Sequence, residues 1–342
     1  MKTVSVIIAT LNESADLEKC LASIRKQNYD QKKIEIIVAD GGSIDNTPII
    51  IKKYRGKLIP EKTNSPEMAK AIALQHTTGE LILMVDSDNI LPHKNWLIKM
   101  VEITEKEPEV TACYPWQYAY KKSDNLLNRY FALLGINDPV PWFLGKADKQ
   151  SYLSPQWILS GKTVDKGSYF LVEFNKESTP TLGANGFLIR KNVLQKANIK
   201  PSHFFHIDVN VDLISQGLNK YAVLKDTIVH TGGDNLSIYL QKKKRYMDSL
   251  YLQQNKNRRY FIYKNSLGDF LRLSLFSLYA LTLIGPLIHS VQGYIKLPDR
   301  AWFLHPVMCF LMFWLYAASV SQYFLTSTIP RLLEKENYTR GT

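Results

Sequence analysis

Cysteine is scarce in this chain of 342 residues, which has only Cys20, Cys113 and Cys309. The three are odd in number, far apart in the sequence and without a Cys-x-x-Cys spacing. Neither a zinc cluster nor a disulfide framework is therefore predicted. A reducing, cytosol-facing location fits this cysteine usage best.

Acidic residues are also few relative to basic ones, with 31 Asp and Glu against 43 Lys and Arg and a formal net charge of +12. This balance favours an anionic partner: nucleic acid, a phosphorylated ligand or an anionic membrane face. No RRM, KH or helix-turn-helix signature is present, so no nucleic-acid partner is predicted. The apolar stretch at residues 4–9 is too short for a signal peptide and predicts a buried strand.

Strand-like and helix-like patterns alternate in the first hundred residues. Short apolar runs predict strands at residues 4–10, 34–40 and 80–86, and helical spacing predicts helices at residues 14–27, 47–54 and 66–76. This alternation is typical of βαβ units in an α/β fold with a mostly parallel sheet. Ligands bind at the carboxyl ends of such strands, where Asp40 and Asp86 are placed.

The composition changes after residue 236. Residues 237–268 interleave basic and aromatic side chains and predict amphipathic helices on a membrane surface, or alternatively a solvated helix. Residues 273–295 and 301–330 contain no Asp, Glu, Lys or Arg, and each exceeds the about 20 residues that a spanning helix needs. A membrane hairpin is the preferred interpretation. The alternatives are a re-entrant pair, helices in one leaflet, or a buried soluble helix pair.

Asp86-Ser87-Asp88 directly follows the third predicted strand. Two carboxylates at positions i and i+2 of a turn can share one hard cation, Mg²⁺ or Mn²⁺, together with a diphosphate. Such a cation neutralises the charge on a departing nucleoside diphosphate. The spacing therefore predicts a metal site formed by Asp86 and Asp88.

Three blocks in order, VIIATLNE, VADGGSIDNT and TTGELILMVDSDN, resemble the family 2 glycosyltransferases of GT-A fold. The resemblance covers residues 3–100 and, more loosely, residues 180–232. It implies a Rossmann-like GT-A catalytic domain over residues 1–236. Within it, residues 1–108 would form the nucleotide-sugar half and residues 109–236 the acceptor half. Interface helices at 237–268, two membrane helices at 269–330 and a tail at 331–342 would follow.

The resemblance also implies roles for single residues on the donor side. Thr10, Asn12 and Glu13 would line the nucleotide pocket, Asp40 would contact the base or ribose, and Ser87 would accompany the two metal ligands. For Asp40 the alternative is an Asx-type cap on the Gly41–Gly42 turn, and for Asp45 a helix cap is preferred.

Two basic residues are further candidates for the diphosphate. Lys70 stands where the family has an arginine and would act as a point charge. Arg245, in an element similar to Gln/Arg-x-x-Arg-Trp, would bind the diphosphate or lipid headgroups.

The acceptor side is implied by two later segments. Residues 182–187 resemble a glycine-containing acceptor loop. Where the family has an acidic pair, Ile207 replaces the first acid, so Asp208 is predicted as the general base, with Asp212 in reserve. Alternatively, Asp208 caps a helix that begins near Val209.

The predicted function is metal-dependent, inverting sugar transfer at the cytosolic face of the cell membrane. The donor would be a nucleotide-diphosphate sugar, with UDP-sugar preferred, and the acceptor a lipid or lipid-linked saccharide. The positive-inside rule places the catalytic domain in the cytosol. The alternatives are a processive polysaccharide synthase, which predicts several membrane helices, an anionic-ligand-binding membrane protein, or an inactive transferase.

Overall fold

A computed structural model describes residues 1–63, 65–154, 156–157, 159–233, 235–253, 258–261 and 266–328. A single sheet with the order β3-β2-β1-β4-β9-β6-β10-β8-β7 lies at its centre, and β5 pairs with β10. The strands are β1 (Val4–Thr10), β2 (Ile34–Asp40), β3 (Lys57–Pro60), β4 (Leu81–Met84), β5 (Asn89–Ile90), β6 (Ala112–Tyr118), β7 (Lys162–Asp165), β8 (Tyr169–Glu173), β9 (Phe187–Arg190) and β10 (Lys220–His230).

The amino-terminal half of the sheet is parallel, as predicted. Strand β1 pairs in parallel with β2 and β4, and β2 pairs in parallel with β3. Thr10 and Asp40 are partners in this register, so both lie at the same sheet edge. The connecting helices are α1 (Ser14–Arg25), α2 (Thr47–Lys53), α3 (Pro66–Gln75) and α4 (Trp96–Lys106).

The second half corrects the expectation of a mostly parallel sheet. Strand β9 runs antiparallel between β4 and β6, β8 is antiparallel to β10, and only β6 and β10 are parallel there. The sheet is therefore mixed, because β9 enters it directly from a loop without a crossover helix. Helices α5 (Leu126–Leu134), α6 (Pro139–Phe143), α7 (Lys191–Leu194) and α8 (His206–Ser215) belong to this half, and short 3-10 turns occupy Gln31–Lys33 and Pro201–His203.

Apolar side chains cover both faces of the sheet. On one face Leu21 of α1 and Met100 of α4 join a buried cluster, and on the other Ala73 of α3 and Leu213 of α8 do so. A third cluster joins α5 and α6 to the carboxyl-terminal helices through residues such as Trp302. The third cluster therefore fixes the carboxyl-terminal helices to the body of the protein.

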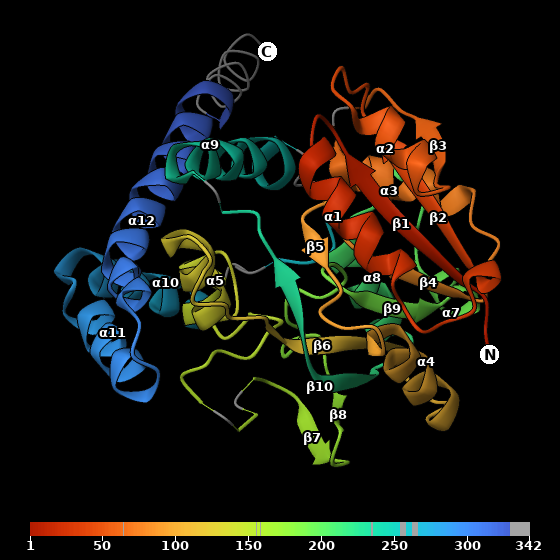
Figure 1. Ribbon diagram of the computed structural model, residues 1–342. Helices are drawn as coiled ribbons and strands as arrows, with labels where there is room; N and C mark the ends of the chain where they lie inside the picture. Colours follow the sequence, from red (N-terminus) through yellow and green to blue (C-terminus); the bar gives the residue numbers. More distant parts are fainter. Residues whose placement is uncertain are drawn as a thin grey trace, which may run out of the picture.

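The carboxyl-terminal helices lie together on one side of the sheet, next to α5 (Figure 1). They are α9 (Leu236–Tyr246), a π-helix at Met247–Gln253, α10 (Leu267–Thr282), α11 (Ile284–Lys296), a 3-10 turn at Arg300–Phe303, α12 (Leu304–Tyr323) and a π-helix at Phe324–Thr328. Among the described residues, Arg300–Thr326 is the one unbroken stretch long and apolar enough to cross a membrane.

The first predicted membrane helix, residues 273–295, is not continuous. Helices α10 and α11 meet at 76° around Leu283, which has a left-handed φ of 60°. Pro286 has no N–H, and its ring excludes the carbonyl four residues earlier, so a straight helix cannot pass this point. The pair is therefore a broken span or a re-entrant loop, and the predicted tail at 331–342 lies outside the described residues.

Candidate active site

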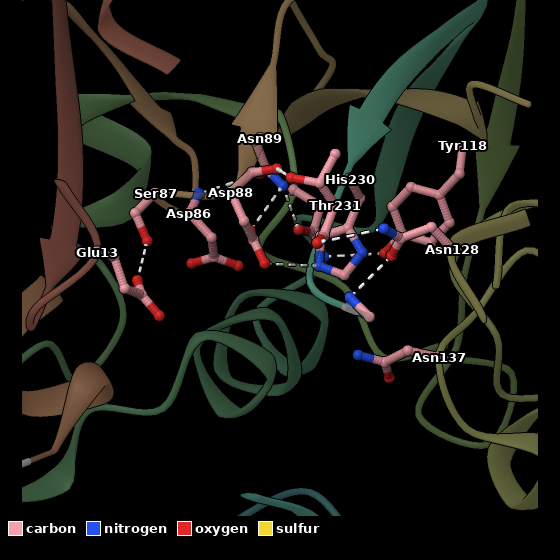
Figure 2. A network of polar contacts seen from close by, with 12 residues as sticks. Glu13, Asp86, Ser87, Asp88, Asn89, Tyr118, Asn128, Asn137, His230 and Thr231 are labelled. Carbon is pink, nitrogen blue, oxygen red and sulfur yellow. Dashed lines mark hydrogen bonds and ion pairs between the residues drawn. The ribbon is translucent and has the colours of Figure 1, made fainter. Parts of the chain in front are cut away.

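Asp86 and Asp88 follow the buried strand β4 in a turn that Asn89 organises. The Asn89 side-chain oxygen accepts a hydrogen bond from Asp86 N at 3.0 Å, and Asn89 Nδ2 donates to Asp88 Oδ1 at 3.3 Å. Figure 2 shows the carboxyl groups of Asp86, Asp88 and Glu13 turned to the same side. The turn therefore presents several negative charges to one common space.

The two aspartates differ in their surroundings. Burial favours the neutral acid, but Lys70 Nζ lies 2.8 Å from Asp86 Oδ1 and lowers the pKa of Asp86 below its ordinary value. Burial raises the pKa of Asp88, the nearby His230 opposes this, and the charge on Asp86 raises it further. Lys70 thus outweighs the effect of burial on Asp86, whereas His230 and Lys242 do not outweigh it on Asp88, whose side chain is 23% exposed.

The donor set around Asp88 fits a hard divalent cation. His230 Nε2 lies 3.4 Å from Asp88 Oδ2, and the ring of His230 stacks on Tyr118 at 5.1 Å. A Cβ on Gly232 would lie 2.5 Å from Asp88 Oδ2, so any residue other than glycine here would collide with this carboxylate. In the described part of the chain, no group of three or more His, Cys, Asp or Glu side chains is arranged to hold a metal ion by itself. Phosphate oxygens and water would have to complete the coordination of a cation here.

Residues predicted for the nucleotide pocket lie beside the two aspartates. Glu13 accepts a hydrogen bond from the Ser87 hydroxyl. It also forms an ion pair with Lys242 of α9, whose Nζ lies 3.4 Å from Glu13 Oε1. Asn12, with a left-handed φ of 54°, accepts a hydrogen bond from Ile44 N at 2.9 Å. Thr10 Oγ1 is buried without a partner among the described residues, so it is available to a ligand.

Asp40 and Asp45 form local turns. Asp40 accepts hydrogen bonds from the Ser43 amide and hydroxyl, which is the Asx-type alternative considered for it. Asp45 accepts from Thr47 N and from Ser14 N, each at 3.0 Å, at the starts of two helices. Asp45 therefore bonds the first residue of α2, close to its predicted cap role, although the N-cap position of α2 is Asn46. A role for Asp40 in nucleotide binding stays a prediction.

Helix α9 brings basic and aromatic side chains to the site. Besides Lys242, its Tyr246 interacts electrostatically with Lys70, Glu67 and Asp86. The Arg245 side chain is exposed. The predicted contact between Arg245 and a diphosphate therefore stays a prediction.

The two predicted bases are held in other ion pairs. Asp208 is fully buried and accepts hydrogen bonds from Arg258 Nε at 2.9 Å, Arg258 Nη2 at 3.1 Å and two backbone amides. Asp212 Oδ1 lies 2.7 Å from Arg259 Nε. None of the described contacts of either aspartate is with Asp86 or Asp88, so a role for Asp208 or Asp212 as the base stays a prediction. The alternative of Asp208 as a cap near Val209 is wrong, because α8 begins at His206.

The sequence analysis did not single out several residues that lie at the site. Asn185, with φ 54°, accepts from Asn89 Nδ2 at 3.0 Å and donates to Tyr118 Oη at 2.9 Å, which ties the predicted acceptor loop to the turn of the two aspartates. Glu67 of α3 contacts both Lys70 and His206. The glycine-rich sequence around Asn185 was a usable signal, whereas Glu67 resembles any acid in the first turn of a helix.

Part of this chain is similar in sequence to known sugar transferases. Residues 5–161 match the family described as Glycosyl transferase family 2. The chain is 31% identical over 100 residues to "Glycosyltransferase AglE" of Haloferax volcanii, covering 28% of this chain and 33% of that protein.

A second relative is "Poly(ribitol-phosphate) beta-N-acetylglucosaminyltransferase TarS" of Staphylococcus aureus. It is 33% identical over 97 residues, which cover 27% of this chain and 17% of that protein. The chain thus spans a third or less of these two relatives.

The fold is also found in a solved structure, "Mannosyltransferase PcManGT from Pyrobaculum calidifontis in complex with GDP-Man and Mn2+". The TM-score is 0.53 and the identity 14%, with 92% of this chain and 87% of that chain covered. At this identity the likeness establishes the GT-A fold.

Proposed function

Residues 5–161 form a Glycosyl transferase family 2 domain, and from this premise we propose that the chain transfers a sugar from a nucleoside-diphosphate sugar to an acceptor hydroxyl. The observation that carries the proposal is the pair Asp86 and Asp88 after β4, beside the buried Lys70, with carboxyl groups turned to the same side as that of Glu13 (Figure 2). A diphosphate with a divalent cation is the ligand whose charges fit this arrangement.

Asp86 and Asp88 would hold the cation, Mg²⁺ or Mn²⁺, through carboxylate oxygens. When bound, it supplies Lewis-acid neutralisation of the charge on the departing nucleoside diphosphate. Lys70, already paired with Asp86, adds a fixed positive charge at the same place. The presence of Mn2+ and GDP-Man in the Pyrobaculum structure supports both the metal and the class of donor.

The nucleotide would lie along the edge formed by the ends of β1, β2 and β4. Asp40 would accept hydrogen bonds from the base or ribose, and Glu13, held by Ser87, would face the ribose or cation. The residues that we propose for the nucleotide side are Thr10, Asn12, Glu13, Asp40, Lys70, Ser87 and Arg245. We further propose that residues 1–108 bind the donor and that residues 109–236 bind the acceptor. A UDP-sugar is our preferred donor.

The acceptor that we propose is a lipid or lipid-linked saccharide at the cytosolic face of the cell membrane. Support comes from exposed apolar side chains on the carboxyl-terminal helices, including Leu278 of α10 and Ile288 of α11. The basic helix α9 lies beside α12 (Figure 1), and its Lys242 reaches Glu13 at the site. A polar reacting group of a membrane-held acceptor would thereby meet the donor at the surface of the bilayer.

Donor hydrolysis by the detergent-purified protein tests the proposal. We expect one member of a panel of nucleotide sugars to release its nucleoside diphosphate with Mn²⁺ and not with chelator. Asp88→Ala should lower this turnover by a factor of at least about 100, because a metal ligand is lost. Asp165→Ala, which removes an exposed carboxylate on β7, is the matched control and should leave turnover unchanged. Full turnover in Asp88→Ala would contradict the metal proposal.

A further inference from the structure

His206, the first residue of α8, is held by a buried carboxylate. Its Nδ1 lies 2.9 Å from both oxygens of Glu67, and its backbone N donates to Glu67 Oε2 at 2.9 Å. Its ring also stacks on Phe205, with centroids 5.0 Å apart and planes inclined by 17°. The imidazole therefore has a fixed position and a fixed plane.

The charge on Glu67 decides which nitrogen of His206 carries the proton. Burial raises the pKa of Glu67, but His206 and Lys70 lower it to about 2, so this carboxyl is ionised near neutral pH. An ionised carboxylate only accepts hydrogen bonds, so Nδ1 must be the donor. In the neutral imidazole the lone pair then lies on Nε2. Within the described residues Nε2 has no hydrogen-bond or ion-pair partner, and the side chain is 15% exposed.

His206 stands between the donor side and the loop at residues 182–187. On the donor side, Glu67 lies 3.7 Å from Lys70 Nζ, which in turn lies 2.8 Å from Asp86. On the other side, a Cβ on Gly183, whose φ is 116°, would lie 2.5 Å from the carbonyl oxygen of His206. The same loop reaches the turn of the two aspartates through Asn185. A general base that takes a proton from the acceptor hydroxyl must lie between the acceptor and the bound donor, a position that His206 fits.

Asp208 does not have these properties. Both of its oxygens are occupied by Arg258 and two backbone amides, and its side chain is fully buried. A buried carboxylate whose lone pairs are occupied in this way offers no access to an acceptor hydroxyl.

We propose that His206 is the general base of the transfer and that Glu67 is its positioning residue. The inference rests on the proposed function. His206 Nε2 takes the proton of the acceptor hydroxyl, and the oxygen forms a bond to the anomeric carbon of the donor sugar. The bond from that carbon to the β-phosphate oxygen breaks, and its electron pair leaves with the nucleoside diphosphate. Glu67 stabilises the imidazolium, which afterwards gives its proton to water.

The first test substitutes His206→Asn in the full-length, detergent-purified protein. Asparagine keeps an N–H for Glu67 and removes the nitrogen at the Nε2 position. We expect nucleoside-diphosphate release from the active nucleotide sugar to fall by about 100- to 1,000-fold, because a positioned base contributes this much. The Kd of the donor should stay within threefold. Turnover within threefold of the unsubstituted protein would overturn the inference, as would an equal loss of donor binding.

Chemical rescue by imidazole and a comparison of single and double variants distinguish a general base from a residue with a structural role. In His206→Ala with Mg²⁺, added imidazole should restore turnover at least tenfold, and absence of rescue would count against a base at this position. Glu67→Gln should lower turnover about tenfold alone but have no further effect in His206→Asn, because the two act as one unit. Asp208→Asn should retain turnover within tenfold when its Tm shows that it is folded.

The outcome for the unsubstituted protein distinguishes this inference from the proposed function. If it binds no nucleotide sugar in the presence of metal, the proposed function fails, and the base assignment fails with it. If it turns over a donor and His206→Asn does so equally well, the function stands and only the base assignment fails.

Discussion

Gly232 is a residue at which one methyl group would reach the centre of the site. A Cβ there would lie 2.5 Å from Asp88 Oδ2 and 3.2 Å from the His230 ring. The nearest atom is the free end of the Asp88 side chain, so Gly232→Ala should displace the Asp88 carboxylate. We expect metal-dependent donor turnover to fall at least tenfold while Tm changes by no more than a few degrees. Gly268→Ala, whose Cβ would meet nothing closer than 4.0 Å, is the control. Equal activity of both variants would contradict the placement of Asp88.

Some of the single residues of the site could be predicted from the sequence, and others could not. Asp86 and Asp88 were predictable because a buried strand directly precedes them, and strand ends are where ligands bind. Asp208 was predicted from its place in a motif, but its partner Arg258 lies 50 residues away and no local pattern reveals it. Glu67 and His206 meet only because the tertiary fold brings the first residue of α8 to α3. Spacing within either helix does not predict that contact.

Among the elements, those with a strong local pattern were predictable. The runs that became β1, β2 and β4 are apolar and fully or largely buried, and the helices between them have one apolar side. Strand β3 was missed because it has four residues and is largely exposed. The antiparallel entry of β9 was missed because strand direction depends on the path of a long connection. The break between α10 and α11 was not predicted, because an apolar stretch of sufficient length outweighed Gly285 and Pro286.

Helix α8 and the segment 258–261 are joined by two ion pairs of different burial. Arg258 and Asp208 have side-chain exposures of 4% and 0%, and Arg259 and Asp212 have 24% and 17%. Arg258→Met leaves a buried carboxylate without its partner and should lower the free energy of unfolding by about 3–5 kcal/mol. Arg259→Met should cost about 1–2 kcal/mol, because its pair and hydrogen bonds are partly solvated.

Chemical denaturation in detergent, followed by tryptophan fluorescence, measures this difference. The double variant Arg258→Met, Asp208→Asn should lose less than the sum of its single variants, because the uncompensated charge is then absent. Equal losses in Arg258→Met and Arg259→Met would show that burial does not set the strength of these pairs.

At the scale of the whole molecule, one side carries many exposed apolar side chains. Large apolar side chains of α10 and α11 are exposed there: Leu271, Leu275, Leu278, Leu281, Ile284, Leu287, Ile288, Val291 and Ile295. The basic helix α9 lies beside α12, the helix that follows α11, and reaches the site through Lys242 (Figure 1). This arrangement suits a bilayer that covers the apolar side chains and holds an acceptor near the donor.

Placing charge on this side should weaken membrane attachment. Each acidic side chain in the hydrocarbon region costs about 2–3 kcal/mol, so Leu278→Glu combined with Ile288→Glu should move protein from the membrane pellet into the carbonate-soluble fraction. Val164→Glu, at a residue of β7 that is 51% exposed, is the matched control and should pellet like the unsubstituted protein. If the double variant pellets equally well, α10 and α11 do not carry the membrane attachment that we propose.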